Sequence, residues 1–147
     1  MTASTQITDP RSFEARTDEA LELLITRLLG DASAECAWFL FLDHRSRVID
    51  PLMPIDFLPA DPDELSDAPD LGAVPISELI VERMGSLLSM IGATELVVVW
   101  ERSGGSMLDA DTRRWITAIA DAASNLGLPL RAQFHLSRSG ARLVSAE

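Results

Sequence analysis

Two short apolar segments constrain the fold of this chain more than any other feature. Residues 36–42 read CAWFLFL and residues 96–100 read LVVVW, and neither segment contains a charged residue. Segments of this length that are apolar throughout are typical of strands covered on both faces, because an exposed face would carry a polar residue at every second position. Such strands need helices on both sides of their sheet, and the sequence therefore predicts an α/β domain.

Three segments with apolar residues at helical spacing supply these helices, at residues 17–29, 75–91 and 110–126. Thr17 and Asp109 are suitable N-caps, because their side-chain oxygens can accept a hydrogen bond from a free helix N–H. Gly30, Gly92 and Gly127 follow the last apolar residue of each helix, where a glycine commonly ends one. The order of helices and strands predicts a single three-layer domain with a mixed β-sheet flanked by helices.

The remaining segments are less regular. Residues 47–49 suit a short second strand, and residues 142–144 suit an edge strand. Residues 128–136 alternate between apolar and polar positions, which predicts a strand with one solvent-facing side. Residues 50–75 contain six of the eight prolines, seven acids and no basic residue. Because proline interrupts both helices and strand ladders, this segment predicts a long irregular loop, with residues 60–70 solvated and mobile.

Charge and composition argue against several classes of function. The chain carries 12 arginines and 23 acids, a net charge of −11, which disfavours nucleic acid as a primary partner. Without lysine or tyrosine, Schiff-base chemistry on lysine and a tyrosine nucleophile are impossible. With one cysteine, no signal peptide and no membrane-spanning run, we expect a cytoplasmic protein that does not enter a membrane. Residues 1–9 are expected to be a flexible tail, and residues 10–147 the single domain.

Three ordered segments carry a resemblance to a known family. The first extends from Glu35 to Ile49 and reads ECAWFLFLDHRSRVI; the second comprises PISELI at 75–80 and IGATELVVV at 91–99; the third extends from Ser103 through Asp111 to Val144. Together they resemble the RadC-like branch of the JAB/MPN metallohydrolase family, over roughly residues 34–145. The resemblance implies a cytidine-deaminase-like arrangement of the mixed sheet and its helices.

The chain departs from the family at the chemistry. In active relatives a His-x-His pair at the end of the central strand and an acid in the next helix hold zinc. Here Trp100 and Arg102 stand at the two histidine positions, and only the acid, Asp111, remains. An indole cannot ligate zinc, and a guanidinium stays positively charged. The resemblance also implies a proton-shuttling role for Glu35 and an oxyanion-stabilising role for Ser103, but without zinc we expect no catalysis, no metal and no cofactor.

Other residues do not rebuild a metal site. His44, His135 and Cys36 lie on three separate segments without ligand spacing, and a lone buried thiol is usually inert. For Arg102 two interpretations stay open: its guanidinium bridges the carboxylates of Glu35 and Asp111, or it points into solvent.

The aromatic residues also admit two interpretations each. Trp100 either is an exposed binding residue or fills the vacated zinc pocket. Trp115 either faces a partner or covers the margin of the core. Phe57 is an interaction candidate if it is exposed.

The function that we expect is a catalytically inactive JAB/RadC-like domain that binds a protein partner, with homodimerisation suggested by analogy alone. One alternative is a hydrolase whose site is reconstituted from Glu35, Ser103 and Asp111. Another is a small-molecule sensor that uses the vestigial cleft, with Trp100 and Arg102 as ligand contacts.

Overall fold

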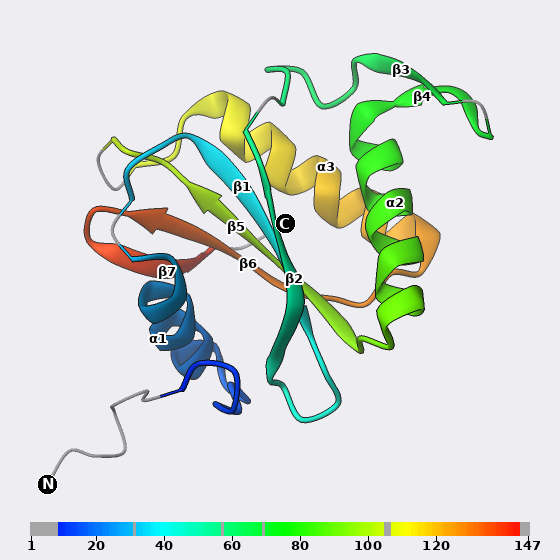
Figure 1. Cartoon of the computed structure of the whole chain (residues 1–147). Coiled ribbons are helices and arrows are strands. Elements are labelled where there is room, and N and C mark those ends of the chain that lie inside the picture. Colours follow the sequence, from blue (N-terminus) through cyan, green and yellow to red (C-terminus); the bar gives the residue numbers. More distant parts are fainter. Residues whose placement is uncertain (1–8, 31, 57, 69, 105–106, 145–147) are drawn as a thin grey trace, which may run out of the picture.

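The computed structural model describes residues 9–30, 32–56, 58–68, 70–104 and 107–144 (Figure 1). A five-stranded mixed sheet in the order β2-β1-β5-β6-β7 forms the middle layer, and β3 and β4 form a separate two-stranded sheet. The elements in chain order are α1 (Asp18–Leu29), β1 (Cys36–Leu42), β2 (Val48–Ile55), β3 (Leu65–Ala68), β4 (Gly72–Pro75), α2 (Ile76–Ile91), β5 (Glu95–Glu101), α3 (Ala110–Leu126), β6 (Leu130–Ser137) and β7 (Gly140–Val144).

The predicted α/β domain is confirmed, and its two apolar segments are the central strands. β1 and β5 pair antiparallel from Cys36–Glu101 to Leu42–Glu95, while β5 and β6 pair in parallel. Side chains alternate between two cores: Phe39 and Val98 lie beneath α2 and α3, whereas Val97 lies beneath α1. Both strands are therefore covered on both sides, as their continuous apolar sequence predicts. No helix among the described residues is long and apolar enough to cross a bilayer.

The three predicted helices are present with their predicted caps. The side chain of Thr17 accepts a hydrogen bond from the N–H of Ala20, and that of Asp109 accepts one from the N–H of Thr112 at 2.7 Å. Gly127 ends α3 in the left-handed conformation, at φ 71°, which a side chain would disfavour. The start of α2 differs from the prediction by one residue: Pro75 is the N-cap of the helix, and Ile76 is its first helical residue.

The prediction of a long irregular loop over residues 50–75 is correct only for its middle, because residues 56 and 58–64 form neither helix nor strand. β2 continues to Ile55 through Pro51 and Pro54, and β3 and β4 pair as an antiparallel ladder beside the start of α2. Because β2 is an edge strand with a neighbour on one side only, it tolerates prolines that lack an N–H. Residues 60–70, expected to be mobile, include Asp61 and Asp70, which form ion pairs with side chains of α3 and α2.

The expected solvent-facing side of the last long strand is also wrong. The polar residues of β6, Gln133, His135 and Ser137, are all buried. β6 lies between β5 and β7, and α1 and α3 cover its two faces, so the alternating positions point into two different protein layers (Figure 1). A buried polar residue in such a place needs a hydrogen-bond partner, and Gln133 has two.

Gln133 connects the sheet to α3 through a buried chain of hydrogen bonds. The indole Nε1–H of Trp100 donates to Oε1 of Gln133 at 2.8 Å, and Nε2–H of Gln133 donates to the carbonyl of Ile116 at 2.9 Å. Trp100 is fully buried, and its ring centroid lies 6.1 Å from that of Trp115. This chain holds β5, β6 and α3 in a fixed relation at the end of the sheet where the polar loop begins.

Replacing Gln133 with methionine (Q133M) tests that connection, because methionine keeps the shape and removes the acceptor. The buried indole N–H of Trp100 then loses its partner, and we expect the free energy of unfolding to fall by about 1–3 kcal/mol. Urea denaturation checks this result, with N125A on the exposed end of α3 as the control. A Q133M protein as stable as N125A would show that the bond adds nothing.

Candidate functional site

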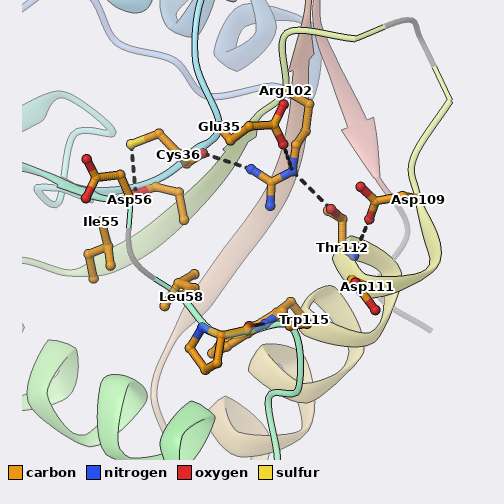
Figure 2. Close-up of a pocket in the computed structure, with 13 residues that line it drawn as sticks. Glu35, Cys36, Ile55, Asp56, Leu58, Arg102, Asp109, Asp111, Thr112 and Trp115 are labelled. Carbon is orange, nitrogen blue, oxygen red and sulfur yellow. Dashed lines mark hydrogen bonds and ion pairs between the residues drawn. The ribbon is translucent and has the colours of Figure 1, made fainter.

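A cleft of about 210 Å³ opens at one end of the sheet. Four segments contribute to its lining (Figure 2): the start of β1 with the residue before it, the loop after β5, the first turns of α3, and the end of β2 with residues 56 and 58–60. Three of these four segments belong to the regions that carry the sequence resemblance, and the fourth belongs to the Pro-rich segment. The cleft therefore lies where the residues singled out from the sequence come together.

Arg102 occupies the middle of this cleft. Its Nε–H donates to Oγ1 of Thr112 at 3.0 Å, and Nη1 donates to the carbonyls of Glu101 at 2.8 Å and Cys36 at 3.5 Å (Figure 2). The centre of the guanidinium lies 5.7 Å from the ring centroid of Trp100, a favourable cation–π distance. Only 18% of the side chain is exposed. The interpretation that Arg102 simply points into solvent is therefore wrong.

The alternative interpretation, a guanidinium bridging two carboxylates, is half correct. Oε1 of Glu35 lies 3.4 Å from Nε of Arg102, and Oε2 accepts hydrogen bonds from the N–H and hydroxyl of Ser103, both at 3.3 Å. Asp111, in contrast, pairs with Arg114 at 3.6 Å and forms no ion pair with Arg102 among the described residues. One turn of helix is enough to give Asp111 a partner of its own, at the i+3 position.

The aromatic candidates lie at different depths. Trp100 is buried beneath Arg102 and does not line the cleft, so it is not an exposed binding residue and not a direct ligand contact. Trp115 lines the cleft, and its Nε1–H donates to the carbonyl of Pro59 at 2.7 Å. It thereby holds residues 58–60 against α3 as a wall of the cleft. Phe57 lies outside the described residues.

Glu101 positions one wall of the cleft, a role that the sequence did not predict. Its Oε2 accepts hydrogen bonds from the N–H groups of Ser33 and Ala34, and its Oε1 accepts one from the indole of Trp38 at 2.9 Å. The residue is only 6% exposed. A carboxylate with three N–H donors is fully compensated. It holds the segment before β1, and thus Glu35, at the edge of the cleft. The feature of the sequence that could have indicated this role is a single acid at the end of an otherwise apolar strand.

The donor set of the cleft does not fit zinc. No group of three or more histidine, cysteine or carboxylate side chains close enough to hold a metal ion occurs among the described residues. His44 lies in the turn after β1 and His135 lies inside β6, so neither lines the cleft. The guanidinium of Arg102 adds a permanent positive charge where a second cation would have to bind.

The remaining ionisable candidates are buried and held neutral. Burial, with Glu101 adding to it, raises the pKa of the Cys36 thiol, which makes the reactive thiolate scarcer. Burial also lowers the pKa of His135, with Arg142 and Arg102 acting in the same direction. Cys36 lies on β1 and His135 on β6, with β5 between the two strands, which is consistent with the absence of ligand spacing between them in the sequence.

Replacing Glu101 with glutamine (E101Q) removes one acceptor oxygen and the charge. We expect the free energy of unfolding to fall by about 1–3 kcal/mol, because N–H groups at the end of β1 lose their partner. The control is E95Q at the opposite end of β5, where Glu95 pairs with Arg131 at 3.5 Å. It is expected to lose less than about 1 kcal/mol. Equal urea midpoints for the two variants would contradict this role.

His135 makes stability depend on pH. Because its pKa in the folded chain lies below the ordinary 6.5, the unfolded chain takes up a proton first as the pH falls. The stability that the neutral imidazole contributes is present above about pH 6.5 and is lost below it. Between about pH 7 and pH 5, H135Q should lose less stability than the wild type, as urea denaturation at the two pH values would measure. Identical losses in the two proteins would remove His135 as the cause.

Comparison of the chain with family models, with curated proteins and with solved structures found no match. The chemistry of the cleft therefore has to be derived from its own residues, above all from the position and the bonds of Arg102.

Proposed function

We propose that this chain is a non-hydrolytic JAB/RadC-like domain that acts by binding a protein. The observation that carries the proposal is the guanidinium of Arg102 in the middle of the cleft, stacked on Trp100 and bonded to the carbonyls of Glu101 and Cys36. A side chain held by that many contacts is a permanent part of the cleft, and its charge cannot be removed at ordinary pH. The position that the resemblance assigns to a catalytic metal is thus taken by a binding group.

The geometry gives little support to the alternative of a reconstituted hydrolase. Ser103 has Glu35 as its neighbour at 3.3 Å, but Asp111 pairs with Arg114 instead of completing a catalytic group with them. Glu35 is 63% exposed and Asp111 is 58% exposed, so solvent weakens the influence of either carboxylate on the serine hydroxyl. Activation of a serine requires a base that is fixed by a third group, and no histidine lines the cleft.

Metal content and hydrolysis test the first half of the proposal. The full chain, purified after expression in zinc-supplemented medium, should contain far less than one zinc per chain. It should not hydrolyse peptide substrates, and a chelator should leave its melting temperature unchanged. R102A should also bind no zinc, because removing the guanidinium leaves a single acid of the expected ligand set. One zinc per wild-type chain, with hydrolysis that a chelator abolishes, would end the proposal.

A further inference from the structure

The donor groups of Arg102 are not all used inside the protein. A guanidinium has five N–H groups. Nε–H bonds to Thr112, and the two N–H groups of Nη1 bond to the carbonyls of Glu101 and Cys36. Nη2 forms no hydrogen bond with any residue that the structure describes, and in Figure 2 this amino group points into the open middle of the cleft. A largely desolvated donor in this position favours a ligand that presents an acceptor oxygen.

The charges around the cleft decide which kind of oxygen that is. Four carboxylates contribute to the lining, those of Glu35, Asp56, Asp109 and Asp111, against the single guanidinium of Arg102. Asp56, on the side of the cleft formed by the end of β2, is exposed and forms no ion pair with a described residue. An anion would be repelled by this surface and by the net charge of −11. A ligand that combines a neutral carbonyl oxygen with a positively charged group would not be repelled.

The size and walls of the cleft narrow the choice further. Its volume of about 210 Å³ is below the range of roughly 300–1,000 Å³ that is typical of drug-sized ligands. Leu58 and Ile55, both half-buried, supply apolar contacts on the side away from Glu35, whereas Trp115 beneath them is buried (Figure 2). Such a space accommodates the aliphatic part of one long side chain with its adjoining peptide group.

We propose, on the basis of the protein-binding function proposed above, that the cleft receives a basic residue from a partner protein. A main-chain carbonyl oxygen of the partner accepts a hydrogen bond from Nη2 of Arg102. The aliphatic part of the cationic side chain lies along Leu58 and Ile55, and its charged end reaches the carboxylate of Asp56. The cleft then distinguishes basic from acidic segments by charge, while Arg102 distinguishes a peptide from a free cation.

Three blocked pentapeptides, acetylated and amidated, test this inference: Ala-Ala-X-Ala-Ala with arginine, norleucine or glutamate as X. The full chain is titrated with each peptide, and the NMR signals of Arg102 Nε–H and Trp115 Nε1–H are followed. The arginine peptide should bind at least about tenfold more tightly than the norleucine peptide, and the glutamate peptide should be the weakest. Agmatine, which has the guanidinium and no carbonyl, should bind more weakly than the arginine peptide and leave the Arg102 signal unshifted.

Matched variants assign the two contacts. D56N should weaken binding of the arginine peptide and leave the norleucine peptide unchanged, whereas D63N removes the same charge from an exposed position outside the cleft lining and should change neither. R102M should reduce the difference in affinity between the arginine peptide and agmatine. If R102M does not fold, D56N still tests whether the cleft prefers a basic side chain. Equal affinities for the three peptides, or an equal effect of D56N and D63N, would overturn the inference.

Failure of this inference can be told apart from failure of the proposed function. Zinc content and peptide hydrolysis are measured on the same preparation. A zinc-free, inactive protein that does not prefer the arginine peptide refutes the basic ligand alone. Chelator-sensitive hydrolysis refutes the non-hydrolytic function whichever peptide binds.

Discussion

The contact of Arg102 with the buried ring of Trp100 determines the geometry and the charge of the cleft at this end of the sheet. An indole in the core needs a hydrogen-bond partner for its N–H, and Gln133 provides one while bonding onward to Ile116. A guanidinium over that ring gains from the electron-rich face and from the carbonyls that close around it. The two side chains stabilise each other's position, one in the core and one in the cleft, and together they place a rigid cationic group at this end of the sheet.

The cleft depends on contacts that join distant parts of the chain. Glu101 holds the segment that leads into β1, and Trp115 holds residues 58–60 through the carbonyl of Pro59. Arg114 pairs with Asp61 at 2.9 Å and adds to the second contact. None of these bonds involves Nη2 of Arg102. The walls of the cleft are therefore fixed by the protein itself, and Nη2 of Arg102 bonds to none of the residues that the structure describes. A preorganised site of this kind loses little conformational entropy on binding.

The sheet ends in two edges that are protected differently. On β2, Pro51 and Pro54 lack an N–H, so this edge strand has fewer donors and is a poorer template for another chain. On β7, side chains of α1 accept the outward N–H groups: Thr26 accepts that of Ala141, and Glu22 accepts that of Leu143 at 3.0 Å. Strand addition at either edge of the main sheet is thus disfavoured, which leaves the cleft as the better-supported place for recognition.

The sequence by itself determined the three helices and the burial of β1 and β5 on both faces. Helix caps such as Thr17 and Asp109, and the apolar runs of β1 and β5, act through neighbours a few residues away, so local pattern is sufficient to predict them. Only the tertiary structure decided that β2 is an edge strand that tolerates prolines, and that the polar residues of β6 are buried. It also decided that Asp111 pairs with Arg114 while Arg102 bonds to Thr112. The pairing of Asp111 with Arg114 is local, three residues apart in α3, but the position of β2, the burial of β6 and the bond between Arg102 and Thr112 depend on how the layers pack, which the spacing of residues does not set.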